Sequence, residues 1–134
     1  MQLSPYLAFQ GNCEEAFKFY AQVLGGEILA ILKHNDTPMK APPGMEDFVM
    51  HARMNLNGTL LMGGDAPANW YKKPEGFNVN IVADTPEDAE RIFKALSEGG
   101  TVGMALQETF WAHRFGTCVD RFGTPWMVNC EKAM

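Results

Sequence analysis

An internal repeat constrains the fold of this sequence more than any other feature. Each half reads as a strand, a helix that ends at paired glycines, and three further strands. The first half carries Glu14-Glu15-Ala16 and Gly25-Gly26, and the second carries Glu87-Asp88-Ala89 and Gly99-Gly100 in the same order. One half alone cannot bury both faces of such a unit, so the halves are expected to pack together. We therefore predict an α+β fold made of two βαβββ modules.

The first module is expected to span residues 1–65, with a connector over residues 66–75. Asn12 is a good N-cap for its helix, and Gly25 ends that helix because glycine adopts the left-handed conformation easily. Asn57-Gly58 between two apolar runs predicts a tight hairpin turn. The apolar face of the helix is expected to consist of Ala16, Phe19, Tyr20 and Val23. The expected strands are residues 3–9, 27–33, 48–56 and 59–62, with a loop over residues 34–44.

The second module is expected to span residues 76–134, within one domain of residues 1–134. Thr85 caps its helix, with Pro86 at the first helical position. Asp120-Arg121 is expected to fix the last hairpin, and Trp126 is expected in the core. The apolar face of the helix is expected to consist of Ala89, Ile92, Phe93 and Leu96. The expected strands are residues 77–83, 101–106, 113–119 and 125–130, with a loop over residues 107–112.

Composition narrows the class of protein. A chain of 134 residues with 46% hydrophobic residues fits one globular domain. A net charge of -5 argues against a nucleic-acid partner, which needs a basic surface. No apolar run approaches the roughly 20 residues that span a bilayer, and the N-terminus lacks the pattern of a signal peptide. With three cysteines and no CxxC spacing, we expect free core thiols and a cytoplasmic protein.

Three segments carry a resemblance to a known family: PYLAFQGNCEEAFKFY, HARMNLNGTLLMGGDAP and, above all, LQETFWAHRFGTCVDRFGTPWMVNCE. Together with the duplicated modules they resemble the vicinal oxygen chelate (VOC) superfamily, which includes glyoxalase I, extradiol dioxygenases and the fosfomycin and bleomycin resistance proteins. The chain looks most like its PhnB-like branch, whose members often carry the label 3-demethylubiquinone-9 3-methyltransferase-like. The resemblance covers nearly the whole chain. It implies a curved mixed sheet with a cleft, and a homodimer.

The resemblance also implies where a metal ion would bind. In metal-using relatives, four side chains from the first and last strands of each module reach the ion, and they are mostly His and Glu. In this sequence those positions fall at Pro5, Met62, Asn78 and Met127. Pro and Met offer no hard ligand and Asn is a weak one. We therefore expect no metal at the usual four-ligand site, and no other cofactor.

Strand alternation points to ligand-binding side chains. In residues 77–81 the apolar residues share one face, and Asn78 and Asn80 share the other. These asparagines are expected to look into the cleft together with Met127 and Asn129. Amides both donate and accept hydrogen bonds, which suits a small polar or anionic ligand. Amides that link strands or face solvent are an equally good interpretation.

Three other side chains are candidates for ligand binding. Arg53 or Arg114 can hold a carboxylate or phosphate through the planar guanidinium fork. A salt bridge to one of the sixteen acidic residues is an equal alternative for Arg53. Trp111 is either a stacking wall for a ligand or an anchor for its loop.

His51 and Glu108 are the candidate catalytic residues. Histidine is a common acid or base near neutral pH, which makes His51 a candidate. Glu108 beside aromatic residues is a candidate base with a raised pKa; a loop carboxylate paired with Arg114 is the alternative. These residues suggest an enzyme: a lyase, isomerase or transferase on a small polar substrate. A further alternative is a displaced divalent-metal site formed by His51, Glu108 and His113. The favoured hypothesis is a protein that binds a small molecule without the usual metal.

Overall fold

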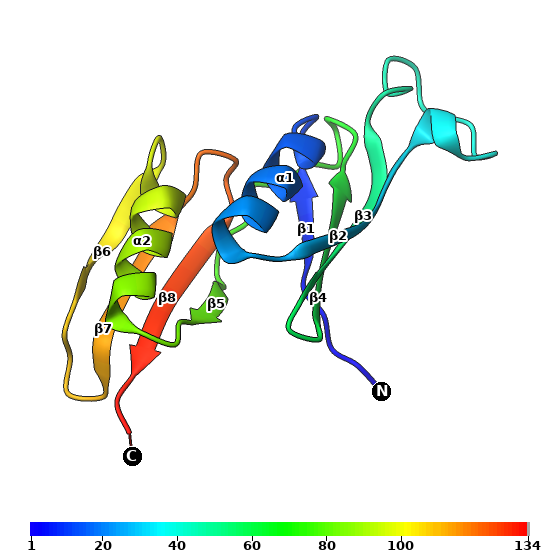
Figure 1. Cartoon of the computed structure of the whole chain (residues 1–134). Helices are drawn as coiled ribbons and strands as arrows, with labels where there is room; N and C mark the ends of the chain where they lie inside the picture. The colour runs from blue at the N-terminus through cyan, green and yellow to red at the C-terminus, as the bar shows by residue number, and fades with distance from the viewer. Residues whose placement is uncertain (134) are drawn as a thin grey trace. The chain divides into compact units, whose positions relative to one another are not determined.

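The computed structural model describes residues 1–133 and divides the chain into two compact units, unit 1 (Met1–Lys73) and unit 2 (Pro74–Met134). The elements follow the predicted order in each unit (Figure 1). Unit 1 contains β1 (Tyr6–Phe9), α1 (Cys13–Leu24), β2 (Glu27–Lys33), the 3₁₀ helix η1 (His34–Asp36), β3 (Val49–Leu56) and β4 (Thr59–Asp65). Unit 2 contains β5 (Val79–Val82), α2 (Pro86–Ser97), β6 (Thr101–Gln107), β7 (Ala112–Val119) and β8 (Pro125–Glu131).

Each unit holds one four-stranded mixed sheet, and the two sheets have the same topology. The strand order is β1-β4-β3-β2 in unit 1 and β5-β8-β7-β6 in unit 2. The first and last strands of each unit pair in parallel, and the other neighbours are antiparallel. This duplicated βαβββ arrangement confirms the predicted fold class.

Strand ends differ from the prediction by a few residues. β1 begins at Tyr6 rather than Leu3, directly after Pro5, which has no N–H to donate to a ladder. β4 continues to Asp65 rather than ending at Met62, because its last residues pair with β1. The predicted loop over residues 34–44 includes η1 at its start.

Each helix packs on one face of its own sheet and buries the apolar core there (Figure 1). In α2 the buried residues are the four that were predicted. In α1 the prediction was wrong at one position, because Phe17 is buried and Phe19 is only half-buried. Trp126 is in the core, as predicted, with 1% of its surface exposed.

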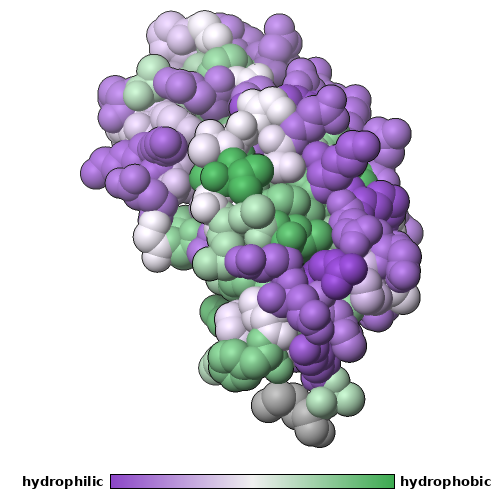
Figure 2. Space-filling model, turned by 90° about the vertical axis from the view of Figure 1, so that its left-hand side faces the viewer, coloured by the Kyte–Doolittle hydropathy of each residue, from purple (hydrophilic) through white to green (hydrophobic). Residues whose placement is uncertain are grey.

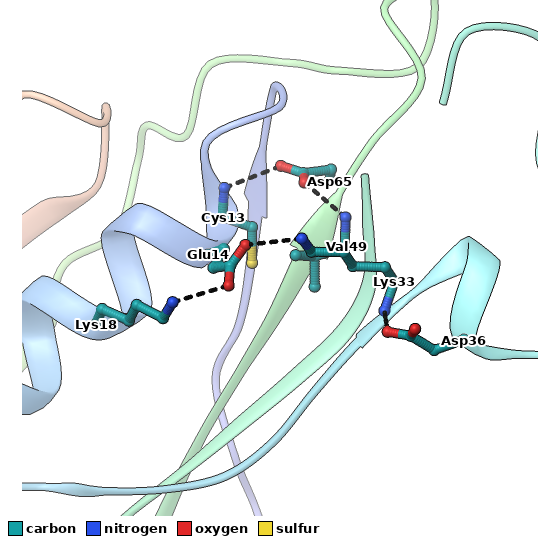
Figure 3. A network of polar contacts seen from close by, with 7 residues as sticks. All are labelled: Cys13, Glu14, Lys18, Lys33, Asp36, Val49 and Asp65. Carbon is teal, nitrogen blue, oxygen red and sulfur yellow. Dashed lines mark hydrogen bonds and ion pairs between the residues drawn. The ribbon is translucent and has the colours of Figure 1, made fainter. Parts of the chain in front are cut away.

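The start of α1 is fixed by a carboxylate from a distant strand. Asp65, at the end of β4, accepts hydrogen bonds from the backbone N–H of Cys13 (3.1 Å) through Oδ1 and of Val49 (2.8 Å) through Oδ2 (Figure 3). Its Oδ1 also accepts from Gly11 N–H at 2.8 Å. Asn12 occupies the N-cap position but makes no capping hydrogen bond with its side chain. Asn12 is therefore at the predicted N-cap position but does not supply the capping hydrogen bond, and Asp65 accepts from Cys13 N–H at the first helical position instead.

Unit 2 uses local polar contacts in place of this long-range one. Thr85 caps α2, as predicted, by accepting a hydrogen bond from Asp88 N–H at 3.1 Å. Asp120 accepts from the N–H of Phe122 (2.8 Å) and Thr124 (3.0 Å) and from Trp126 Nε1 (2.8 Å). These bonds hold the β7–β8 turn, which confirms the predicted role of Asp120.

Two further predictions are confirmed by local geometry. Asn57 and Gly58 have φ angles of 50° and 88°, which a two-residue hairpin turn requires at both positions. Cys13, Cys118 and Cys130 are free and buried. Burial raises the pKa of the Cys13 and Cys118 thiols, so these thiols stay protonated and act as small core residues.

Candidate functional site

The face of each sheet turned away from its helix, here called the open face, carries four of the candidate site residues: His51, Arg53, Asn80 and Asn129. In unit 1 the register places Tyr6 beside Met62, and Met62 beside Arg53. Residues paired across neighbouring strands share a face, so these three side chains lie on one surface. The open face of unit 1 is formed by Tyr6, Ala8, Met62, Gly64, His51 and Arg53.

Unit 2 presents register-equivalent residues on its own open face. Asn80 lies beside Met127, and Met127 lies beside Thr117; Asn129 lies beside Val82 and Phe115. The equivalent pairs, unit 1 first, are Tyr6 and Asn80, Ala8 and Val82, Met62 and Met127, Gly64 and Asn129, His51 and Phe115, and Arg53 and Thr117.

The side chains at the usual metal positions do not suit a divalent ion. The resemblance implies Pro5, Met62, Asn78 and Met127 at these positions, and the register places Tyr6 beside Met62 and Asn80 beside Met127. Phenol, thioether and amide groups are poor ligands for a hard divalent cation. Across residues 1–133, no group of three or more His, Cys, Asp or Glu side chains could hold a metal ion. Glu108 and His113 belong to a different unit from His51, and these three residues do not make such a group.

On unit 1, Tyr6 reaches across β4 to cover His51. The two rings stack with centroids 5.9 Å apart and an interplanar angle of 22°. A Cβ at Gly64 would lie 2.9 Å from Tyr6 Oη and 2.9 Å from the carbonyl oxygen of Met50. The missing side chain of Gly64 therefore makes room for the Tyr6 ring, which is 54% exposed.

Arg53 is exposed on the same face. None of the ion pairs within residues 1–133 involves Arg53. The salt bridge considered from the sequence is therefore absent from the described residues. Its cross-strand neighbours, Ala30 on β2 and Met62 on β4, are apolar.

On unit 2, Asn129 is the most buried candidate residue, with 7% of its surface exposed. Its Nδ2 donates a hydrogen bond to Glu131 Oε1 at 3.1 Å. Its Oδ1 is buried and has no hydrogen-bond partner among the residues that the structure describes. Asn80 is exposed on the same face, whereas Asn78 is exposed before the start of β5.

Aromatic rings lie beside this amide. Trp111 packs edge-on against Phe115 at 5.3 Å and against Phe110 at 4.9 Å, measured between ring centroids. Phe115 is the cross-strand neighbour of Asn129. Trp111 is 37% exposed and Phe110 is 90% exposed. This loop therefore presents aromatic surface next to the open face.

Arg114 does not share that face. Arg114 pairs with Cys130, and its neighbour Phe115 pairs with Asn129 on the open face, so strand alternation puts the Arg114 side chain on the side of α2. There its Nε contacts Glu90 Oε1 at 3.0 Å. The guanidinium of Arg114 is therefore engaged in a surface ion pair on the helix side of the sheet.

Glu108 does not have the raised pKa that its aromatic neighbours suggested. It is exposed, and its Oε2 lies 2.9 Å from Lys132 Nζ. The hydrogen bond and positive charge of Lys132 lower the pKa of Glu108. The prediction of a raised pKa was therefore wrong, and Lys132 rather than Arg114 is the partner. His113 is exposed on β7.

Sequence reasoning missed Tyr6, Gly64, Phe115 and Thr117. The repeat held a signal for them, because matching Met62 to Met127 also matches Gly64 to Asn129. Matching the two modules in this way identifies the open-face positions at which their side chains differ most.

Apolar side chains are also exposed along β6, an edge strand without charged residues. Val102 is 48% exposed and Met104 is 42% exposed. Figure 2, which faces the side of Figure 1 on which β6 lies, shows hydrophobic residues bordered by hydrophilic ones. Among residues 1–133, no helix is both long and apolar enough to cross a membrane.

Comparison with known proteins places this fold in a family. Residues 1–129 match the family model described as 3-demethylubiquinone-9 3-methyltransferase. The chain is 45% identical to protein PA1353 from Pseudomonas aeruginosa, with a TM-score of 0.92 and 99% of each chain covered. It is 37% identical to protein YjdN of Escherichia coli, over 98% of this chain and 97% of that protein.

Two more distant structures share the architecture. A PhnB protein from Bacillus cereus, described as a putative 3-demethylubiquinone-9 3-methyltransferase, is 27% identical, with a TM-score of 0.81, 97% of this chain covered and 99% of that one. A glyoxylase/bleomycin resistance protein/dioxygenase domain from Frankia is 11% identical, with a TM-score of 0.63, 98% of this chain covered and 95% of that one. The second likeness concerns the fold alone.

Proposed function

This chain belongs to the 3-demethylubiquinone-9 3-methyltransferase family, in its PhnB-like form and with the fold of the glyoxalase/bleomycin resistance/VOC superfamily, and we propose that it binds a small molecule on its open sheet faces. The family description names a reaction. The side chains on the open faces support the binding of a small molecule. The residues at the superfamily's usual metal positions are poor ligands for a divalent cation, so the proposal includes no metal ion there.

The observation that carries the proposal is the unpartnered Oδ1 of Asn129. A buried amide oxygen without a hydrogen bond costs about 1–3 kcal/mol, so native structures rarely leave one unsatisfied. A ligand or an ordered water with an N–H or O–H group supplies the missing donor. Asn129 is thus the predicted specificity contact for a polar group on unit 2.

The neighbours of Asn129 indicate the rest of the ligand. Asn80 adds a second amide on the same face, and Phe115 and Trp111 offer ring surface for stacking or edge contacts. Small-molecule sites commonly combine apolar walls with a few polar groups that fix orientation. The expected ligand for this face is a small polar molecule with at least one hydrogen-bond donor and an apolar part.

A thermal-shift screen of neutral polar metabolites tests the proposal, because a ligand that prefers the native state raises the melting temperature. We expect at least one compound to stabilise the wild type and the control Asn69→Leu, which alters an exposed asparagine in unit 1, but not Asn129→Leu. No stabilising compound, or equal stabilisation of Asn129→Leu, would count against Asn129 as the contact.

We also propose that the chain forms a homodimer, as the family resemblance implies. The exposed apolar side chains of uncharged β6 support self-association of an acidic chain, because no like charges on that strand would oppose contact. Sedimentation equilibrium should give twice the mass of the chain, and a monomer at micromolar concentration would reject the dimer.

Catalysis with His51 as acid or base remains the second hypothesis. The stack with Tyr6 orients the ring of His51, which is half-buried. Glu108 supports this hypothesis less well, since its paired and exposed carboxylate lacks the raised pKa that a base at neutral pH needs.

A further inference from the structure

We propose that the open face of unit 1 binds a small planar organic acid, with its anionic group in the fork of Arg53 and its flat apolar body on Tyr6 and Met62. This inference deepens the proposed function, because it assigns a charge class of ligand to unit 1. It rests on the proposed function in one respect, namely that the open faces are binding surfaces.

The first support is the state of Arg53. Arg91 and Arg114 each contact a carboxylate, at 3.7 Å and 3.0 Å, whereas Arg53 is not part of any ion pair among residues 1–133. Glu27 is an acidic residue of β2 near this face, but it lies beside Asn55 rather than Arg53. An exposed guanidinium without an acidic partner, in a chain of net charge -5, is available to an external anion.

The second support is the apolar frame around that charge. Arg53 lies between Ala30 and Met62 across the strands, and His51 lies beside Leu32, which is 39% exposed. These apolar neighbours offer no carboxylate or carbonyl side chain that would compete with an external anion for the guanidinium. The planar fork of arginine donates two parallel hydrogen bonds to a carboxylate or a phosphate group.

The third support is the room that Gly64 provides. Without a Cβ at that position, Tyr6 lies across β4 and presents a flat ring beside His51. In unit 2 the equivalent position holds Asn129, and Asn80 stands where Tyr6 would be. Only unit 1 therefore has a flat ring beside an arginine at these equivalent positions. This combination favours an anion with a planar body.

Benzoate, acetate and inorganic phosphate are suitable probes, because they separate the charge from the flat body. Titration of ¹⁵N-labelled chain, observed at arginine side-chain Nε–H and backbone N–H signals, reports where each probe binds. We expect benzoate to shift Arg53 Nε–H and the amides around Met62, and to bind at least about tenfold more tightly than acetate or phosphate. Equal affinity for the three probes would overturn the assignment to a planar acid.

Variants test the two contacts separately. Arg53→Gln should weaken benzoate binding about tenfold or more, as expected from loss of a charge-assisted contact worth at least 1.4 kcal/mol. The control Arg91→Gln, on exposed α2, should bind like the wild type. Unchanged binding by Arg53→Gln, or an equal loss in Arg91→Gln, would contradict the role of Arg53.

Gly64→Ala removes the space for Tyr6, and Tyr6→Leu removes the ring without adding a Cβ beside the strand. Both variants should lose the preference for benzoate over acetate, and Tyr6→Leu keeps the test decisive if Gly64→Ala does not fold. A preference retained in Tyr6→Leu would reject the stacking surface. Because these measurements concern unit 1 signals, their outcome is separate from stabilisation through Asn129 in unit 2.

Discussion

The two units share a backbone plan but differ in what their open faces can bind. At equivalent register positions, unit 1 has Arg53 where unit 2 has Thr117, and Gly64 where unit 2 has Asn129. One face therefore offers a positive charge beside a stacked ring, and the other offers amides beside aromatic rings. The helix-covered faces hold the apolar core of each unit, whereas the open faces carry the side chains that we propose to bind ligands.

The same comparison holds for the polar contacts that stabilise each unit. Asp65 joins three segments of unit 1 that are far apart in the sequence, whereas Asp120 joins residues of one turn. Cys130 stands at the position equivalent to Asp65, so α2 has no such distant carboxylate and relies on its own cap at Thr85. Unit 1 is therefore held by a long-range contact and unit 2 by local ones.

Loss of either buried carboxylate is expected to have the largest effect. Asp65→Ala and Asp120→Ala should each lower the free energy of unfolding by about 3–5 kcal/mol, because each leaves several N–H donors without a charged acceptor. Urea denaturation measures the loss, and amide hydrogen exchange locates it. Loss of protection should concentrate in unit 1 for Asp65→Ala and in unit 2 for Asp120→Ala; uniform loss in both would remove the distinction between the units.

Exchange of one core position between the units is expected to have the next largest effect. Gly63 is equivalent to Val128, but a Cβ at Gly63 would lie 2.8 Å from the carbonyl oxygen of Leu7 and 2.9 Å from the Phe17 ring. Gly63→Val should therefore destabilise the chain by about 2–3 kcal/mol through overpacking. Thermal and urea unfolding measure this, and a neutral result would mean that the α1 side of unit 1 has space like that of unit 2.

The helix starts give a smaller and sharper contrast. Thr85→Ala should cost about 1 kcal/mol, because it removes the hydrogen bond to Asp88 N–H. Asn12→Ala should cost less than Thr85→Ala, because Asp65 already accepts from Gly11 and Cys13 N–H. Matched urea curves compare the two, and a larger loss for Asn12→Ala would contradict the different anchoring of α1 and α2.

Alkaline pH provides a further test, through a buried thiol of unit 2. Burial, and next the charge of Asp120, raise the pKa of the Cys118 thiol to about 11, above its ordinary value of 9.0. The unfolded chain therefore loses this proton first, so the stabilisation is complete below about pH 9 and is lost as pH rises toward 11. Urea unfolding across this range should show a shallower decline for Cys118→Ala than for the wild type, and identical slopes would mean that Cys118 does not contribute.

The sequence predicted the order of elements because its signals there were local and repeated. The helix stop at Gly25, the Asn57-Gly58 turn and the Thr85 cap each depend on residues within one turn of chain. The capping hydrogen bond at the start of α1 could not be predicted from local sequence, because its acceptor, Asp65, lies more than fifty residues away in the chain.

The candidate site was harder to predict for the same physical reason. Glu108 is paired with Lys132, and Arg114 is paired with Glu90 on α2. Neither partner can be identified from the local sequence pattern. Asn80 shares its face with Met127 and Asn129, and Arg53 lies on the open face of unit 1, because simple strand alternation holds for their strands.

One exchange of side chains tests most directly whether the open faces divide binding between them. The double variant Arg53→Thr with Thr117→Arg moves the guanidinium to the equivalent position in unit 2. Benzoate titration, followed by backbone amide shifts, should then perturb the amides around Met127 and Asn80 and leave those around Met62 and Tyr6 unchanged. Perturbations that remain in unit 1 after this exchange would contradict the account.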